Sequence, residues 1–120
     1  MMLRTGLLLL PSRPSSELRD LAVLAEALGY NDFWLADERF FREVYSLLAL
    51  AATRTTRIRL GPCVTDPFSR HPALTAMAIA TLHEISAERA VLGIGAGVSG
   101  FQELGSMPSA LPSPSARRCS

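Results

Sequence analysis

Four short apolar segments recur along the chain, and their spacing restricts the possible folds more than any other feature. The segments are Leu7 to Leu10, Asp32 to Ala36, Ile58 to Pro62 and Ala90 to Ile94. Near-continuous apolar runs of this length are typical of strands in a parallel sheet. Because one parallel βαβ unit takes about 30 residues, the spacing predicts parallel strands joined by helical crossovers.

The segments between the predicted strands have the periodicity of amphipathic helices. Ser15 or Ser16 is expected to cap the first helix, which ends before Gly29, and Pro72 suits the first turn of the third helix. The apolar positions are Leu18, Leu21, Ala22, Ala25 and Leu28 in the first helix, Val44, Leu47, Leu48 and Ala51 in the second, and Leu74, Met77, Ala78, Leu82 and Ile85 in the third. The predicted order is β-α-β-α-β-α-β, an α/β fold.

Two architectures fit this order. One is a small open doubly wound sheet, and the other is the N-terminal half of a TIM (β/α)8 barrel, which typically takes about 250 residues. From Ser106 onward the sequence is rich in proline and serine, has no acidic residue and cannot continue the alternation. We therefore expect an α/β domain over residues 1–105 and a disordered C-terminal tail over residues 106–120.

The composition argues against several classes of partner. The 120 residues carry a net charge of +1 and include no lysine, so the chain lacks a basic surplus for nucleic acid or an anionic membrane surface. The apolar run near the start is far shorter than the roughly 20 residues of a membrane-spanning helix. Cys63 and Cys119 form neither a CxxC pair nor a disulfide framework, which favours a reducing compartment, the cytoplasm.

Chemically distinctive residues follow the second and third predicted strands, where active sites of parallel α/β folds are built. Asp37, Glu38 and Arg39 follow the second strand, and these residues alone fit a solvated turn as well as a site. The segment GPCVTDPFSRHP follows the third strand, and its prolines predict a stiff loop that either introduces the next helix or shapes a pocket. His71 in this loop is expected to be structural, and no metal site is predicted.

The glycines after the fourth predicted strand satisfy the letters GxGxxG at Gly95, Gly97 and Gly100. A dinucleotide-binding fingerprint belongs on the first βα unit with an acidic residue about 20 positions further on, and this context is absent. Gly93, Gly95 and Gly97 remove side chains at alternate positions. This spacing suits the close approach of either a flat ring or another backbone.

Taken together, the segments GYNDFWLADERFFREVYSLLALAATRTTRIRLGPCVTDPFSRHP and ERAVLGIGAGVSGFQELG resemble the N-terminal part of the luciferase-like monooxygenase superfamily. The resemblance is nearest to the coenzyme F420 dependent branch that contains methylenetetrahydromethanopterin reductase. It covers about residues 3–105, and it implies a TIM barrel of which this chain holds the N-terminal half.

The resemblance also implies the site residues. Asp37 would steady the deazaflavin ring. Glu38 occupies the position at which relatives often have a histidine that is proposed to exchange protons. Asp37 and Glu38 are therefore the candidate catalytic residues. Cys63 and Val64 would back the ring through a cis peptide bond at a bulge, and Thr65 is the adjoining contact. The remaining cofactor contacts would be Gly95, Ala96, Gly97 and Ser99. Relatives usually carry glycine where this chain has Glu88, and a left-handed backbone at this position would strain a residue with a side chain.

These expectations define a function. We expect an oxidoreductase, truncated relative to its family, whose complete relatives transfer a hydride between the deazaflavin F420 and a small organic substrate. An FMN-dependent monooxygenase of the same fold is the first alternative, and an inactive, associating half-barrel is the second. Unpaired sheet edges predict a homo-oligomer or an aggregation-prone fragment. No nucleic acid or membrane partner is expected.

Overall fold

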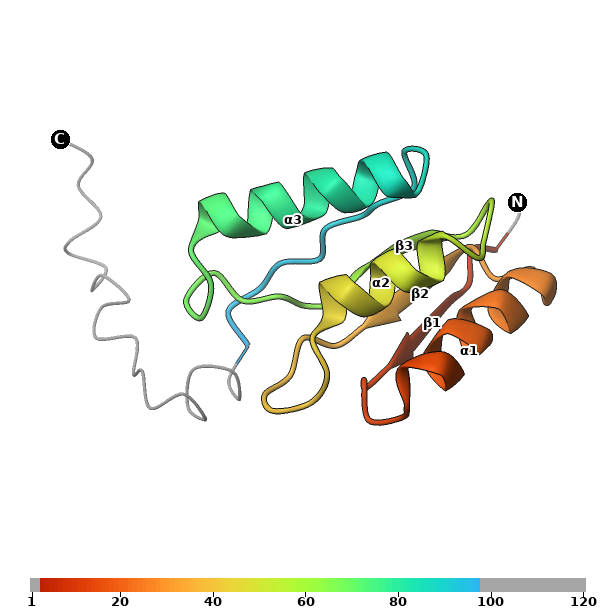
Figure 1. The fold of residues 1–120 in the computed structure, drawn as a ribbon, viewed down its shortest axis with the longest axis horizontal. Helices are drawn as coiled ribbons and strands as arrows, with labels where there is room; N and C mark the ends of the chain where they lie inside the picture. The colour runs from red at the N-terminus through yellow and green to blue at the C-terminus, as the bar shows by residue number, and fades with distance from the viewer. Residues whose placement is uncertain (1–2, 98–120) are drawn as a thin grey trace, which may run out of the picture.

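Parallel strands alternate with helices along the chain in the computed structural model, which describes residues 3–97 (Figure 1). The elements are β1 (Gly6–Leu9), α1 (Ser15–Ala27), β2 (Asp32–Leu35), α2 (Val44–Ala52), β3 (Arg59–Pro62) and α3 (Pro72–Ile85). Each lies where the apolar pattern predicts it. The predicted boundary at residue 105, the predicted tail, Ser99, Gly100 and Cys119 lie outside the described residues.

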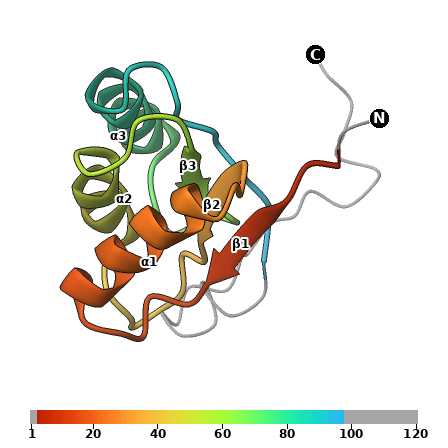
Figure 2. The same ribbon diagram turned by 90° about the vertical axis from the view of Figure 1, so that its right-hand side faces the viewer.

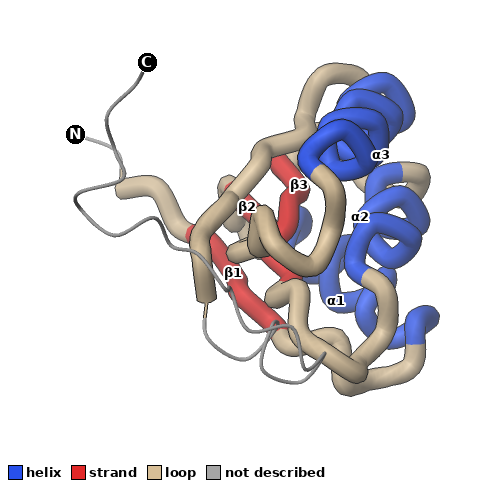
Figure 3. The backbone as a smooth tube through the Cα atoms, turned by 90° about the vertical axis from the view of Figure 1, so that its left-hand side faces the viewer, coloured by secondary structure: helices blue, strands red, loops and turns tan. Residues whose placement is uncertain are grey.

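The strands form a parallel sheet in the order β1-β2-β3, and the three helices of the described part cover one face of it (Figures 2 and 3). The register places Leu7 beside Phe33 and Phe33 beside Leu60. Phe33 and Leu60 are fully buried in the core under the helices. On β1, Leu8 alternates with these inward positions and is 54% exposed. In residues 3–97 the second face of the sheet has no helix over it.

The fourth predicted strand runs parallel to β3 but forms no regular ladder. Isolated bridges pair Leu60 with Ala90 and Thr65 with Ile94, so the β3 side contains one residue more than the segment facing it. This extra residue is a bulge, and it interrupts the ladder without changing the direction of the chain. The predicted order of elements is therefore confirmed, whereas a regular strand over Ala90 to Ile94 is not formed.

Glycines let this last segment approach β3. A Cβ atom on Gly61 would lie 1.7 Å from the Val91 carbonyl oxygen, and a Cβ atom on Gly93 would lie 2.6 Å from the Pro62 carbonyl oxygen. Both distances are shorter than a side chain tolerates. For Gly93, the close approach of another backbone therefore explains the missing side chain.

The helix caps differ in part from the predicted ones. Pro14 is the N-cap of α1 and no side chain caps this end, so the capping expected from Ser15 or Ser16 is wrong: the helix already includes both serines. The Glu43 carboxylate caps α2 by accepting hydrogen bonds from the backbone N–H groups of Tyr45 and Ser46. The Nδ1 atom of His71 accepts from the Ala73 N–H at 3.1 Å and caps α3, which is a structural role as expected.

A buried arginine joins the helices at the amino ends of the strands. Arg89 is 9% exposed, and its guanidinium donates to the carbonyl oxygens of Ala52, Thr55, Ile58 and Ser86 at 2.6 to 3.0 Å. It also donates to the Thr55 hydroxyl at 2.9 Å. The side chain thereby donates hydrogen bonds to carbonyl oxygens at the end of α2, in the turn into β3 and at the end of α3.

Replacing Arg89 with methionine should destabilise the chain more than any surface arginine substitution. The change leaves buried carbonyl oxygens without donors, and each such orphan costs about 1–3 kcal/mol. We expect Arg89→Met to lower the free energy of unfolding by about 3 kcal/mol or more, measured by urea unfolding. Arg54→Met, at an exposed position of the turn after α2, is the matched control and should change it little. An Arg89→Met chain as stable as this control would contradict the account.

The two residues that follow the C-cap of α3 lie in the left-handed region, which residues with side chains rarely adopt. Ala87 has φ 53° and Glu88 has φ 67°, so the left-handed conformation considered for Glu88 is present. The backbone hydrogen bonds from Ala87 N–H to Glu84 and from Glu88 N–H to His83 are those of a Schellman motif. At the corresponding end of α1 the left-handed position is occupied by Gly29, with φ 88°.

Glycine at either position of the α3 terminus should stabilise the fold. Relief of left-handed strain gains roughly 1–2 kcal/mol, and the greater freedom of glycine in the unfolded chain offsets part of it. We expect Ala87→Gly and Glu88→Gly each to raise the free energy of unfolding by up to about 1 kcal/mol. The control Glu84→Gly lies inside α3 and should destabilise by about 1 kcal/mol. Destabilisation by all three substitutions would refute the explanation.

Candidate functional site

Asp37 lies just beyond the carboxyl end of β2 and is nearly buried, with 8% of the residue exposed. Its Oδ2 atom accepts a hydrogen bond from the Thr65 hydroxyl at 2.6 Å, and its Oδ1 atom accepts from Arg39 Nη1 at 2.9 Å. Donors therefore hold both carboxylate oxygens. The lone pairs that these two bonds leave unused can accept a further hydrogen bond.

Thr65 joins the ends of three chain segments. Its backbone N–H donates to the Gly93 carbonyl at 2.9 Å, and its own carbonyl accepts from the Gly95 N–H at 3.1 Å. Its hydroxyl makes the bond to Asp37 described above, and the residue is fully buried. Three candidate residues from distant parts of the sequence, Asp37, Thr65 and Gly95, are thereby brought together.

The bulge before Thr65 carries the other candidates. The peptide bond between Cys63 and Val64 is cis, as the resemblance implied, and a second cis bond, between Arg39 and Phe40, was not anticipated. Cys63 is a half-buried free thiol, whereas Val64 is 39% exposed. The Val64 side chain lies in ordinary contact range of a Cβ built on Gly95, at 3.5 Å. The bulge at Cys63 and Val64 and the glycine segment, residues 93–97, thus form a continuous surface.

A second carboxylate, Asp66, follows Thr65 and fixes the loop into α3. It accepts hydrogen bonds from the backbone N–H groups of Phe68 and Ser69 and from the Ser69 hydroxyl, at 2.6 to 2.9 Å. Burial by itself would raise the pKa of Asp66, but these hydrogen bonds and the charge of Arg39 lower it below its ordinary value. Asp66 is therefore an ionised, structural acceptor.

The remaining candidate residues are Glu38, Ala96, Gly97 and Ser99. Glu38 is half-buried and lines, with Asp37, a cavity of about 470 Å³ between the loops that follow β2 and β3. The walls of this cavity include Phe40, Phe41 and His71. Ala96 and Gly97 are exposed, and Gly97 has φ 59°. The proposed role of Ser99 cannot be placed because the residue lies outside the described part.

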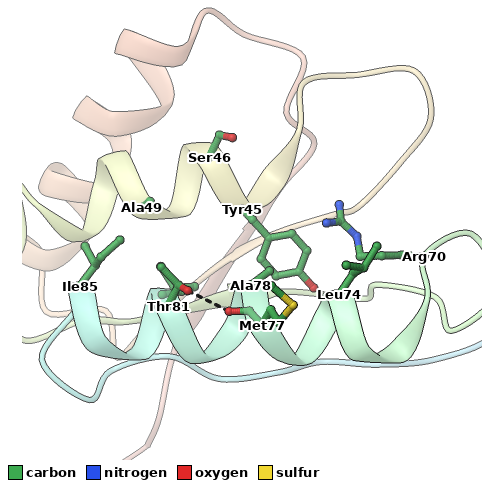
Figure 4. Close-up of a pocket in the computed structure, with 10 residues that line it drawn as sticks. Tyr45, Ser46, Ala49, Arg70, Leu74, Met77, Ala78, Thr81 and Ile85 are labelled. Carbon is green, nitrogen blue, oxygen red and sulfur yellow. Dashed lines mark hydrogen bonds between the residues drawn. The ribbon is translucent and has the colours of Figure 1, made fainter.

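A separate groove of about 490 Å³ lies between α2 and α3 and contains none of the predicted site residues. Figure 4 shows the Tyr45 ring pointing from α2 toward α3, and the Arg70 guanidinium lies 4.7 Å from the ring centroid. The buried Tyr45 hydroxyl makes no hydrogen bond to a described residue. Burial raises the pKa of Tyr45, and the nearby Thr65 hydroxyl, which donates to Asp37 instead, partly opposes this.

The sequence reasoning did not identify the contacts of Arg39, Asp66 and Ser69. A signal was present for Asp66, since an Asp-Pro pair favours the start of a turn in which the aspartate side chain accepts from the backbone two residues on. No comparable signal existed for the contacts of Arg39 with Asp66 and Ser69, because these partners lie 27 and 30 positions away.

Between residues 3 and 97, no three histidine, cysteine or acidic side chains are grouped so as to hold a metal ion. In the same part of the chain, no helix has the length and apolar character needed to cross a membrane.

Proteins of known structure share the fold of this chain. The chain is 46% identical over 95 residues to 5,10-methylenetetrahydromethanopterin reductase of Archaeoglobus fulgidus, a match that covers 79% of this chain and 29% of the relative. The coenzyme F420 dependent tetrahydromethanopterin reductase of Methanopyrus kandleri superposes with a TM-score of 0.84 at 37% identity, covering 88% of this chain and 30% of that one.

A flavin-containing structure is also similar. The oxygenating constituent of 3,6-diketocamphane monooxygenase from Pseudomonas putida, a type II Baeyer-Villiger monooxygenase in complex with FMN, superposes with a TM-score of 0.72 at 28% identity. This match covers 82% of the present chain and 31% of the monooxygenase. The chain thus spans about 30% of the length of the relatives it matches.

These likenesses decide between the two architectures considered from the sequence. The described residues have the fold of the N-terminal part of a TIM barrel, not that of a small open sheet. The sequence profile of the family described as luciferase-like monooxygenase matches residues 3–117. The chain belongs to the luciferase-like monooxygenase family.

Proposed function

We propose that this chain provides the ring-binding wall of a coenzyme F420 dependent oxidoreductase, in which a hydride passes between the deazaflavin and a small organic substrate. The observation that carries the proposal is the junction at Thr65, which joins Asp37, the Cys63–Val64 bulge and Gly95. The similarity to an F420 dependent reductase at a TM-score of 0.84 supports the choice of cofactor.

The exposed groups at this edge fit a planar heterocycle. A ring of this kind needs an apolar surface to lie against and a few polar groups at its rim. Val64 and Ile94 are 39% and 54% exposed. Gly95 and Gly97 add no side chain that would stand in the way. The residues that would hold the ring are therefore Cys63 and Val64 behind it and Gly95, Ala96 and Gly97 beside it. The resemblance adds Thr65, which is fully buried and would act through the backbone it fixes, and Ser99, which lies outside the described residues.

Two acidic residues would serve the bound ring in different ways. The cofactor itself supplies the carbon that accepts or releases the hydride. Asp37, whose oxygens are already held by Thr65 and Arg39, would accept a hydrogen bond from a ring N–H and stabilise the positive charge that develops on the ring as a hydride leaves it. Glu38 lines the cavity beside it and would exchange protons with the ring or the substrate.

Two alternatives rest on specific observations. The similarity to an FMN-bound monooxygenase favours an FMN-dependent monooxygenase. Incorporation of an oxygen atom from O2 into an organic product, which spontaneous oxidation of free reduced FMN does not give, would distinguish it from the first proposal. The exposure of Leu8, Leu10 and Ile94 favours an inactive, associating fragment that forms a homo-oligomer. We also propose the division into residues 1–105 and a tail, 106–120, and a cytoplasmic location, because Cys63 is a free thiol.

Binding of the ring alone tests the proposal. The probe is 8-hydroxy-5-deazariboflavin, titrated by fluorescence into the purified chain. We expect a dissociation constant of roughly 10–1000 µM, because the wall contributes ring contacts only. Val64→Asp, which puts a charge into the proposed wall, should weaken binding about tenfold or more.

The matched control is Val23→Asp. Val23 lies on α1, is 40% exposed, and is not one of the proposed ring contacts. This substitution should leave the affinity unchanged. No detectable binding at millimolar probe, or equal weakening by both aspartates, would reject the proposed wall.

A further inference from the structure

The guanidinium of Arg39 contacts the carboxylates that follow both β2 and β3. Nη1 donates to Asp37 Oδ1 at 2.9 Å and to the Asp37 carbonyl oxygen at 3.2 Å. Nη2 donates to Asp66 Oδ2 at 3.3 Å and to the Ser69 hydroxyl. Because a guanidinium is planar and its donors point in fixed directions, these contacts set the position of one carboxylate relative to the other.

The Asp66 side of this contact is rigid. Backbone N–H groups of Phe68 and Ser69 and the Ser69 hydroxyl hold Asp66 in the turn that leads to α3. Because this turn holds the guanidinium in place, Arg39 loses less conformational entropy on binding Asp37 than a mobile surface arginine would.

The Asp37 side is shielded from water. The side chains of Arg39 and Asp37 are 16% and 6% exposed, so solvent screens this pair less than a surface ion pair. Asp37 is held by Arg39 on one oxygen and by Thr65 on the other. Its orientation toward the proposed ring wall therefore depends on both partners.

We infer that Arg39 is a positioning residue of the proposed site: it acts through Asp37, whose carboxylate it holds against Thr65, and it locks that carboxylate to the loop after β3. The inference rests on the proposed function for the ligand that Asp37 would face. Lysine cannot replace arginine fully here, because an ammonium on a flexible stem cannot reach both carboxylates with fixed geometry.

Ring affinity provides the first test, with 8-hydroxy-5-deazariboflavin as the probe and the whole chain as the protein. We expect Arg39→Met to weaken binding about tenfold, the scale of one charge-assisted hydrogen bond, and Arg39→Lys to recover part of the loss. The double variant Asp37→Asn with Arg39→Met should bind no more weakly than Asp37→Asn alone, because Arg39 acts through Asp37. The inference is overturned if the losses of affinity from the two substitutions add up in the double variant, or if Arg39→Met binds the probe with full affinity.

Carboxyl NMR provides a second readout that needs no ligand. The charge of Arg39 lowers the pKa of Asp66, so Arg39→Met should raise the pH at which the Asp66 carboxyl carbon titrates and should shift the Asp37 carboxyl signal. The matched control Arg54→Met should move neither signal. Unchanged carboxyl signals in Arg39→Met would overturn the inference even if the ring binds. Changed signals in a chain whose wild type does not bind the ring would uphold the positioning role and reject the proposed function.

Discussion

The arrangement of the strand ends depends on the buried Thr65, where three distant parts of the chain meet. Its backbone N–H and carbonyl bond to Gly93 and Gly95, and its hydroxyl bonds to Asp37. Because Thr65 is fully buried, none of these groups can turn to water instead. An unpaired buried polar group costs about 1–3 kcal/mol, so the residue fixes the bulge of β3, the glycine segment and the acidic residue after β2 relative to one another.

The stabilising contacts of Arg89 and the proposed site lie at opposite ends of the sheet. At the amino ends, Arg89 satisfies carbonyl oxygens of two helix ends and of the turn into β3, while the Glu26 carboxylate accepts from the backbone N–H groups of Thr56, Arg57 and Ile58. At the carboxyl ends, Asp37 faces the cavity beside Glu38. This division is the usual one in parallel barrels, where loops at the carboxyl ends carry function on a scaffold fixed at the other end.

Much of the fold could be predicted because apolar periodicity is local information: each helix and each of the first three strands lies where its own residues indicate. The bulge opposite Ala90 to Ile94 was not predictable from periodicity, since one extra residue in β3 changes the register without changing composition. At the site, the resemblance supplied Asp37, Thr65 and the cis bond after Cys63. The bridging role of Arg39 could not be read from the sequence, because it depends on how two loops are placed in space.

The central claim is that the strand ends joined at Thr65 form a single wall for a planar ring, and amide NMR of the labelled chain tests it most directly. On addition of 8-hydroxy-5-deazariboflavin, the account predicts that the largest shifts occur at the amides of Val64, Thr65, Gly93 and Gly95. Shifts concentrated instead at Met77 and Thr81, in the groove between α2 and α3, would place the ring elsewhere and contradict the account.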